Sequence, residues 1–513
     1  MLVDNLRKAR WLVVSLPFSA LLALGLAWVS TSFSGFDGWL SFWVVLLLMG
    51  AVVWMTWRAL RHEDLPRWLL TLVLLAAFLR LALGVFWFLS LPVWGYENDV
   101  QQAGYVMRDA FERDTDAWEM AQSDQPLSVA FRGSAYDQYG GLLFGSALLY
   151  RYLGTDVHQP LLVVVVTAFF SALAVIYCWL FSRKLWGERV ALLAAWFLAL
   201  YPEAMLLGSA QMREAFMVTL TIALVYYLYC FWHSREWRHL AVSVVLMLVS
   251  AAISFPFAGW LFLLVVLLSL VFARDFLVSQ KYSWVAIFLV MVAVIVFYWT
   301  NQDWITKAGG YQLYLTWRGS GHLQELFKKL PRWLWPPFIV IYGIFRPLLP
   351  AALIARSGSL LWQIVAIWRS LGWTCLLLFL IYASFLSLKN KSWYKAPGVL
   401  LLVNWIFILA ASYRGGGDDW DNPRYRVAVA GVQVALVAWA LVHRQERKDP
   451  WLRRFIGLSA VMVFWVLLWY APRYFTELPW SAGKPLDAVG LGFVSGVLYL
   501  IWDLVRGERI LAS

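Results

Sequence analysis

Acidic residues gather in one polar stretch of the chain, 92–159, and two of them stand directly behind a long apolar run. Glu97 and Asp99 lie in "VWGYENDVQQ", where the chain should leave a membrane. A carboxylate at this boundary is either a solvated helix end or a general base whose basicity is raised by partial burial near lipid. Asp137 follows in "AYDQYGGLLFG", ahead of Gly-rich apolar sequence that we expect to dip back into the interface.

Charged residues also occur where two later apolar runs meet, in "ALYPEAMLLGSAQMREAF". Glu203 follows Pro202 at the end of one run, and Arg213 and Glu214 begin the next. Charges at this depth are costly unless they pair or face a wet cavity. The pattern therefore indicates either a functional cluster or an Arg–Glu pair that locks two helix ends.

Arginines and aspartates are interleaved around a late polar segment, 413–425. They are Arg414, Arg424 and Arg426 with Asp418, Asp419 and Asp421. Guanidinium groups at an interface suit bidentate capture of a phosphate, and they suit pairing with these acids equally well. The three aspartates also offer oxygen ligands for a divalent cation, Mg²⁺ or Mn²⁺.

No motif for nucleotide or soft-metal chemistry competes with these groups. The chain has no Walker-type loop and no dinucleotide fingerprint behind a strand. Its six histidines are scattered, and its three cysteines lie in apolar runs without metal-ligand spacing. The net charge of +12 is carried largely by short connectors, which indicates control of membrane topology rather than nucleic-acid binding.

The elements that must position these residues are membrane spans. A chain with 62% hydrophobic and 14% charged residues is not soluble in composition, and its apolar runs match a bilayer core of about 30 Å. We expect an all-α polytopic membrane protein with about 14 transmembrane helices, the first of them retained rather than cleaved. The spans are expected at 11–30, 39–57, 68–91, 160–182, 188–207, 210–232, 239–255, 257–273, 283–299, 367–388, 397–412, 426–443, 455–471 and 487–505.

The connectors fix an expected orientation. Alternate connectors such as "SRKLWGER", "HSREWRH" and "HRQERKDPWLRR" are basic, as they should be on the cytoplasmic side. The run 333–354 would upset this alternation by crossing, and its prolines favour a re-entrant or membrane-surface segment. We therefore expect cytoplasmic termini, an inner-membrane location, and external loops at 92–159 and 300–366.

The order of these elements resembles the GT-C superfamily of polytopic glycosyltransferases, which includes protein O-mannosyltransferases and aminoarabinose transferases. The resemblance rests on "ENDVQQAGY", "YDQYGGLLFGSALLYRYLG", "FSRKLWGERVALLAAWFLALYPE" and "SAQMREAF" over residues 68–235, and on the late "NPRYR". The chain departs from the family in having "YGG" for "PPL" and Glu214 for an aspartate. Two added spans suggest a division into a two-helix hairpin (1–67), a GT-C-like helical module (68–299), an external or re-entrant region (300–366) and a C-terminal helical module (367–513).

The resemblance implies an inverting transfer of a sugar from a polyprenyl-phosphate donor to a hydroxyl of a lipid, glycan or protein on the extracytoplasmic side. Asp99 would be the general base, with Glu97 and Asp137 as the next candidates. A second set would bind the donor phosphate or support the site. It comprises Arg213, Arg414, Arg424 and Arg426 for the phosphate, and Glu203 and Glu214 in support.

No cofactor is required by this mechanism, because arginines can stabilise the leaving phosphate, and nucleic acid is not an expected partner. Two alternatives stay open from the sequence. One is an enzyme like an O-antigen ligase or polymerase, which uses a lipid pyrophosphate donor. The other is a flippase or transporter for a lipid-linked sugar.

Overall fold

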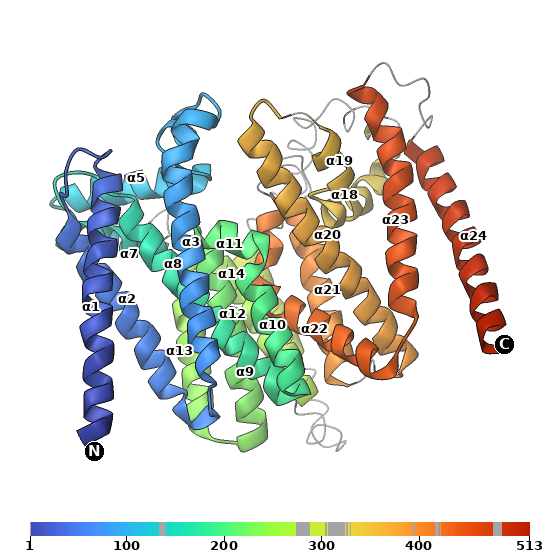
Figure 1. Ribbon diagram of the computed structural model, residues 1–513, viewed down its shortest axis with the longest axis horizontal. Helices are drawn as coiled ribbons and strands as arrows, with labels where there is room; N and C mark the ends of the chain where they lie inside the picture. The colour runs from blue at the N-terminus through green and yellow to red at the C-terminus, as the bar shows by residue number, and fades with distance from the viewer. Residues whose placement is uncertain are drawn as a thin grey trace. The chain divides into compact units, whose positions relative to one another are not determined.

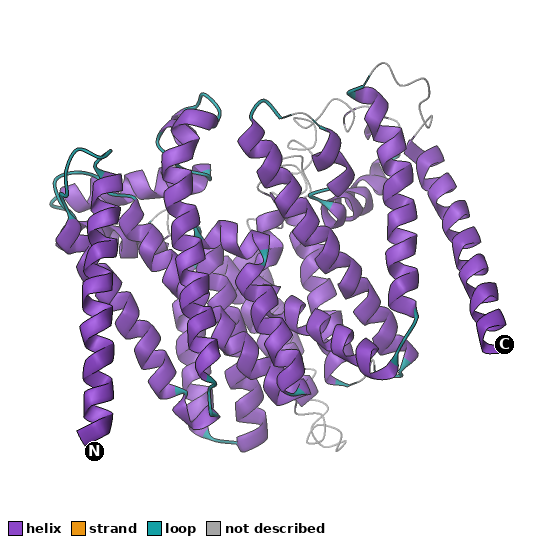
Figure 2. Ribbon diagram, in the orientation of Figure 1, coloured by secondary structure: helices purple, strands orange, loops and turns teal. Residues whose placement is uncertain are grey.

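A computed structural model of the protein describes residues 2–132, 140–272, 288–302, 305, 324, 327–328, 330–355, 357–392, 395–415, 420, 422–475 and 485–512. Helices joined by turns and short loops make up this described part, and no strand occurs in it (Figures 1 and 2). The expected fold class, an all-α polytopic membrane protein, is confirmed.

Nine helices in the described part are long and apolar enough to cross a membrane, or ten if one bent helix pair counts as a span. They are Trp39–Ala59, Arg67–Trp94, Leu161–Trp186, Arg213–Ser234, Leu360–Lys389, Ala396–Arg414, Asn422–Arg447, Trp451–Tyr470 and Asp487–Arg506. Shorter apolar helices occupy Leu16–Ser30, Trp237–Ile253, Phe255–Leu270 and Phe288–Gln302. Each expected span therefore has a helix at its position, and the protein is an integral membrane protein, but the count of 14 crossings is not confirmed.

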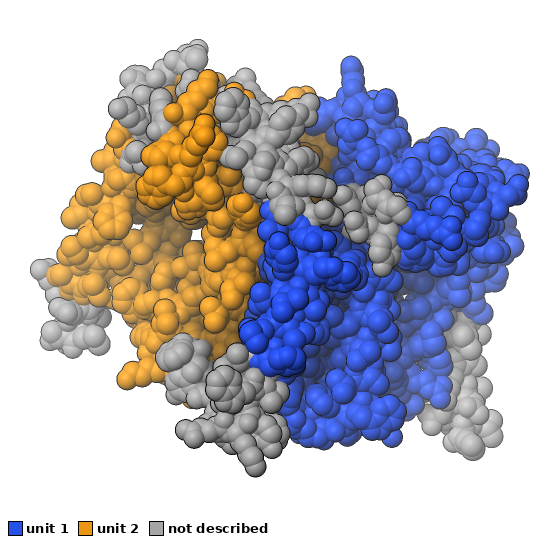
Figure 3. Space-filling model, turned by 180° about the vertical axis from the view of Figure 1, so that it is seen from behind, with its two compact units in different colours: residues 1–181, 195–306 blue, residues 182–194, 307–513 orange. Residues whose placement is uncertain are grey.

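The chain forms two compact units, coloured separately in Figure 3. Unit 1 contains residues 1–181 and 195–306, and unit 2 contains residues 182–194 and 307–513. The expected division after residues 67, 299 and 366 stays a prediction.

Unit 1 begins with a helical hairpin and is organised around three packed helices. Its elements are α1 (Leu2–Ser30), α2 (Trp39–Ala59), η1 (Arg61–Glu63), α3 (Arg67–Trp94), α4 (Asp99–Gln102), α5 (Arg108–Gln122), η2 (Leu127–Phe131), α7 (Gly140–Leu153), α8 (Leu161–Ala172), α11 (Pro202–Gly208), α12 (Arg213–Ser234), α13 (Trp237–Ile253) and α14 (Phe255–Phe272). The boundaries between the two units fall within two further helices, α9 (Ala174–Trp186) and α10 (Glu188–Leu200). The helices α3 and α12 both pack against α8, and α12 is apolar around most of its circumference because it is buried on nearly all sides (Figure 1).

The polar stretch 92–159 is itself largely helical, because it contains α4, α5, η2 and α7. The helix α5 buries Ala110, Arg113, Asp114 and Ala117, whose spacing places them on one face of a helix, and it packs against α7. Arg151 of α7 donates to several carbonyls at the C-terminal end of α5. A cation at this end satisfies carbonyls that lack intrahelical partners and complements the helix dipole.

A break separates α10 from α11, and the two helices meet at an angle of 52°. Pro202 begins α11 and has no N–H, so it cannot donate to the carbonyl of Leu198 as a helix would require. Arg80 from the middle of α3 supplies a donor instead: its Nη2 lies 3.4 Å from the Leu198 oxygen, and its Nη1 lies 2.9 Å from the Ala76 oxygen. The expected end of a span at Pro202 is therefore a bend that a buried guanidinium holds.

Unit 2 is a bundle of long helices. Its elements are η4 (Arg332–Leu334), α18 (Trp335–Phe345), α19 (Leu349–Ile354), α20 (Leu360–Lys389), α21 (Ala396–Arg414), η5 (Asn422–Val429), α22 (Ala430–Arg447), α23 (Trp451–Tyr470), η6 (Ala471–Arg473) and α24 (Pro485–Ala512). Asp503 of α24 accepts hydrogen bonds from Arg453 at 2.6 Å and Arg454 at 2.8 Å, which ties α24 to α23. The run 333–354 is split into helices of 11 and 6 residues, each too short for the roughly 20 residues of a crossing, as expected for a re-entrant or surface segment.

Candidate active site

Glu97 and Asp99 flank the start of the short helix α4. The helix α3 ends at Trp94, and the N–H of the following Gly95 reaches the Leu91 carbonyl at 2.8 Å. Asn98 then caps α4 by accepting from the Gln101 N–H at 3.0 Å. Both carboxylates are exposed, and neither has a hydrogen-bond or ion-pair partner in the described part of the chain. Of the two alternatives, the partial burial that would raise the basicity of a general base is not observed, and both acids are open to a ligand from solution.

Four other predicted residues lie outside the described residues. They are Asp137, Asp418, Asp419 and Asp421. Their assignment as a base or as cation ligands therefore stays a prediction. Among the residues that are described, no group of three or more His, Cys, Asp or Glu side chains could hold a metal ion.

A buried carboxylate that the sequence analysis did not single out lies close to these acids in the chain. Asp114 of α5 is fully buried and accepts hydrogen bonds from the hydroxyls of Tyr105 at 2.6 Å and Tyr150 at 2.9 Å. His158 Nε2 lies 3.1 Å from the same carboxylate, and its ring stacks on Trp118 with 5.1 Å between centroids. Asp114 thus joins α5, α7 and the two loops that flank them.

The Asp114 network holds both phenols in their neutral form. Burial raises the pKa of Tyr105 and of Tyr150 well above the ordinary value, and the charge of Asp114 raises both further. The register of α5 was the signal that could have found the network, because Asp114 falls on the same helical face as Ala110 and Ala117. Its full burial makes Asp114 a residue that positions the stretch rather than one that touches a substrate.

The charged residues around α11 and α12 are buried together. Glu203 is 4%, Arg213 6% and Glu214 2% exposed, although all three lie at helix N-termini. Arg213 Nε and Glu214 Oε1 are 3.4 Å apart, so these neighbours form an ion pair. Because both residues belong to the first turn of α12, this pair does not join two helix ends, and both the locking pair and the role of Arg213 in binding a donor phosphate stay predictions.

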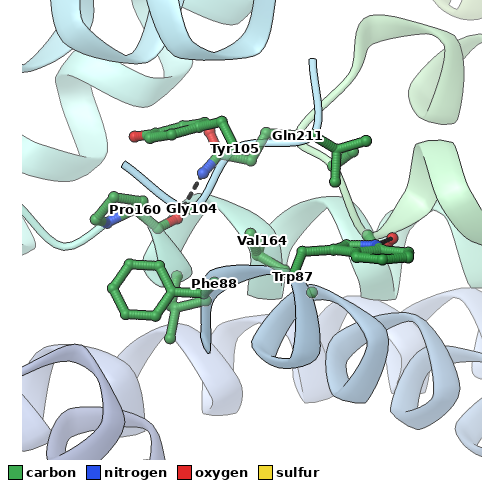
Figure 4. Close-up of a pocket in the computed structure, with 12 residues that line it drawn as sticks. Trp87, Phe88, Gly104, Tyr105, Pro160, Val164 and Gln211 are labelled. Atoms are coloured by element: carbon green, nitrogen blue, oxygen red, sulfur yellow. Dashed lines mark hydrogen bonds between the residues drawn. The ribbon is translucent and has the colours of Figure 1, made fainter. Parts of the chain in front are cut away.

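A small cavity opens beside the N-terminus of α12 and contains about 310 Å³ of empty space, including open solvent at its mouth (Figure 4). Its lining includes Trp87, Phe88, Tyr105, Pro160, Val164 and Gln211. The indole of Trp87 is fixed by a 3.0 Å hydrogen bond to the Ser209 hydroxyl. Gly104 adopts a φ of +80° where a Cβ would lie 3.0 Å from the backbone of Phe88, which lets this loop close over α3.

In unit 2 the late arginines gather around aromatic rings. The guanidinium carbons of Arg414 and Arg424 lie 4.6 Å and 5.1 Å from the ring centroid of Tyr425, and both side chains are therefore held beside one ring. Arg426 lies 3.4 Å from the ring centroid of Trp373 and donates to the Gly343 carbonyl at 3.2 Å.

The structure thus groups the predicted site residues within each unit. Asp99, Glu97, Glu203, Arg213 and Glu214 belong to unit 1, and Arg414, Arg424 and Arg426 belong to unit 2. Arg213 and Glu214 are in contact, and Arg414 and Arg424 share Tyr425. The joint action of residues from the two units stays a prediction.

Part of the chain matches the model of a known family. Residues 142–299 fit the family model described as dolichyl-phosphate-mannose-protein mannosyltransferase. This stretch overlaps the region in which the sequence resembles GT-C glycosyltransferases, so the expected resemblance is confirmed there. No curated protein sequence matches the chain.

Solved structures similar to the chain include two proteins with bound lipid phosphates. One is the oligosaccharyltransferase AglB from Archaeoglobus fulgidus in complex with an inhibitory peptide and a dolichol-phosphate, with 13% identity, a TM-score of 0.38, and coverage of 86% of this chain and 56% of that chain. The other is ArnT from Cupriavidus metallidurans bound to undecaprenyl phosphate, with 14% identity, a TM-score of 0.31, and coverage of 81% of this chain and 87% of that chain. The chain spans a little over half the length of AglB.

Proposed function

We propose that this membrane protein is an inverting glycosyltransferase that moves a sugar from a polyprenyl-phosphate donor to a hydroxyl of a lipid, glycan or protein acceptor. The observation that carries the proposal is the match of residues 142–299 to a family of transferases that use a mannosyl phosphate of dolichol. That stretch includes Glu203, Arg213 and Glu214. The alternation of basic connectors supports an inner-membrane protein with cytoplasmic termini and an extracytoplasmic active site.

The reaction needs a base for the acceptor and a cation for the leaving group. Asp99 takes the proton of the acceptor hydroxyl as its oxygen attacks the anomeric carbon from the face opposite the phosphate. The bond from the anomeric carbon to the phosphate oxygen breaks, and the lipid phosphate leaves as an anion. The position of Asp99 directly behind the end of α3, where an acceptor hydroxyl can reach its carboxylate, supports this assignment, with Glu97 and Asp137 as the next candidates.

The arginines stabilise the charge that grows on the departing phosphate. Arg424 and Arg426 are supported in this role by their fixed stacking on Tyr425 and Trp373, because a guanidinium that is already oriented does not need to reorganise in the transition state. Arg414 and Arg213 complete the phosphate-binding set, and Glu203 and Glu214 orient Arg213. No metal ion is required if this set suffices.

The test is transfer of a labelled sugar from a synthetic polyprenyl phosphate by the full-length protein in liposomes. Asp99→Asn should lower the rate about 100- to 10,000-fold, because that is the usual effect of removing a general base. Asp156→Asn is the matched control, since Asp156 is another exposed aspartate of the same stretch to which the mechanism gives no role. Near-full transfer by Asp99→Asn would refute the assignment of the base.

Two further measurements test whether the site needs a metal ion and whether the enzyme transfers a single sugar or acts as a ligase. Loss of transfer in chelator that is restored by Mg²⁺ or Mn²⁺ would contradict an arginine-only site and point to Asp418, Asp419 or Asp421 as ligands. Surface glycans from cells with and without the gene should differ by a single sugar. Accumulation of an intact lipid-linked oligosaccharide would instead indicate a ligase with a pyrophosphate donor.

A further inference from the structure

Residues 95–98 connect α3 to α4 as a short turn that leads from one exposed acid to the next. Glu97 lies at the centre of a three-residue turn, because the Asn98 N–H donates to the Tyr96 carbonyl at 2.8 Å. Asp99 is the first residue of α4, directly behind the N-cap residue Asn98. The two carboxylates are exposed, while hydrogen bonds hold the backbone that carries them.

The side chain of Gln101 ties this turn to α4. Its Oε1 accepts the Tyr96 N–H at 2.5 Å, and the Gln101 N–H donates to Asn98 Oδ1 at 3.0 Å. Gln101 is 7% exposed, although the acids around it are open to solvent. An amide oxygen buried in this way is costly to leave without a donor, which favours the turn that brings the Tyr96 N–H to it. Gln101 therefore joins the residue before Glu97 to the helix that begins with Asp99.

Gly95 leaves the space that this contact needs. A Cβ at this position would collide with Gln101 Oε1 and with the Leu91 carbonyl oxygen. The Gly95 φ of −79° is open to any residue, so the close approach of these atoms, and not an unusual backbone conformation, requires the glycine. The glycine and the glutamine of "WGYENDVQ" thus form one contact that fixes where the acids lie.

We propose that Gln101 is a positioning residue, which holds the general base Asp99 in place through the Tyr96 backbone. The proposed function enters only in naming Asp99 as the base. A base must lie within hydrogen-bond reach of the proton that it takes, and a displacement of about 1 Å can lower the rate about 100-fold. Since the Asp99 carboxylate is exposed and has no hydrogen-bond or ion-pair partner among the described residues, its position follows from its backbone. Gln101 supplies that constraint without touching the substrate.

The chain offers a matched control in the next residue, Gln102. It belongs to the same helix and is exposed, and its Nε2 lies 3.5 Å from the Pro92 carbonyl oxygen, at the limit of a hydrogen bond. Gln101→Met and Gln102→Met remove the same groups from neighbouring positions, and only the first removes the acceptor of the Tyr96 N–H. Gln101→Asn is the second variant if Gln101→Met does not fold, because it keeps an amide but draws the oxygen back by one methylene.

The first experiment is hydrogen–deuterium exchange of the full-length protein in lipid nanodiscs, read by mass spectrometry with fragmentation that resolves the Tyr96 N–H. Gln101→Met and Gln101→Asn should speed this exchange about 3- to 10-fold, because the turn loses one neutral hydrogen bond. Gln102→Met should exchange at the wild-type rate. Equal exchange in wild type and both Gln101 variants would overturn the inference.

The second experiment, the transfer assay, separates positioning from folding. Gln101→Met should lower kcat about 3- to 10-fold and leave the Michaelis constants of donor and acceptor nearly unchanged. In an Asp99→Asn background the same change should have little further effect, because the base that Gln101 positions is already absent. An equal loss in both backgrounds would overturn the inference, since it would show that Gln101 does not act through Asp99.

The two proposals fail in different ways. Transfer that depends on Asp99 but not on Gln101 would refute the positioning role alone. Exchange at Tyr96 that depends on Gln101, together with no transfer by wild type, would refute the proposed function alone and leave Gln101 as the residue that holds the turn.

Discussion

The buried carboxylate of Asp114 should be a main determinant of the stability of the polar stretch 92–159. Asp114→Ala removes the acceptor of two phenols that are almost fully buried, Tyr105 at 6% and Tyr150 at 2% exposure. Each buried donor left without a partner costs about 1–3 kcal/mol, so the free energy of unfolding should fall by about 2–6 kcal/mol. Asp114→Asn keeps one carbonyl oxygen as an acceptor, and the loss should be about half as large.

The assay follows thermal unfolding with a thiol-reactive fluorophore. Cys178 and Cys230 are buried in unit 1, whereas Cys375 of unit 2 is exposed. In a Cys375→Ser background the signal therefore reports the opening of unit 1. A loss of 2 kcal/mol or more should lower the unfolding midpoint by at least about 3 °C.

The control is a second aspartate of the same helix. Asp116 is exposed and two residues from Asp114, and Asp116→Asn removes the same charge without breaking a buried hydrogen bond. The expected order of midpoints at pH 7 is Asp116→Asn at or above wild type, then Asp114→Asn, then Asp114→Ala. A midpoint for Asp114→Ala within a degree of wild type would show that the network does not hold this stretch together.

Two more variants test the electrostatics and the bend. Burial, followed by the charges of Glu119 and Glu112, raises the pKa of Asp116, so the folded protein binds that proton more tightly than the unfolded chain and loses this stability as the pH rises through the raised pKa. Asp116→Asn should therefore raise the unfolding midpoint at pH 7 and leave it unchanged at pH 3. An equal gain at pH 7 and pH 3 would contradict this electrostatic cause. Arg80→Met should lower the free energy of unfolding by about 1–3 kcal/mol, because the Leu198 carbonyl loses its donor. The loss should be smaller in a Pro202→Ala background, whose new N–H can donate to the same carbonyl. Strictly additive effects on the unfolding midpoint in the double variant would argue against a shared acceptor.

The spans were predictable because they follow from length and apolarity alone. The expected spans 39–57 and 426–443 correspond to helices at Trp39–Ala59 and Asn422–Arg447, since a bilayer selects about 20 apolar residues wherever they occur. Pro202 was identified as the end of a span, and the structure shows a bend there. The difference is a tertiary effect, because the donor for the Leu198 carbonyl comes from Arg80, far away in the sequence.

The interior of the polar stretch was not predictable in the same way. Asp114 appears in the sequence as one acid among many, and its burial depends on Tyr150 and His158, which follow 36 and 44 residues later. Gln211 carried no signal, because its contacts with Arg113 and Pro160 join residues far apart in the sequence. Helical register could have placed Asp114 on the buried face of α5, but no pattern names the donors that meet it there.

The segment from the α10–α11 bend to the start of α12 behaves as one positioned piece because three distant parts of unit 1 hold it. Arg80 of α3 anchors the carbonyl just before the bend, Arg113 of α5 anchors the carbonyl of Gln211, and the Gln211 amide reaches Pro160 ahead of α8. Buried donors and acceptors of this kind are tolerated beside lipid only when they are paired. Loss of any one anchor should therefore shift the cavity and Arg213 together, since Arg213 follows Gln211 by two residues at the start of α12.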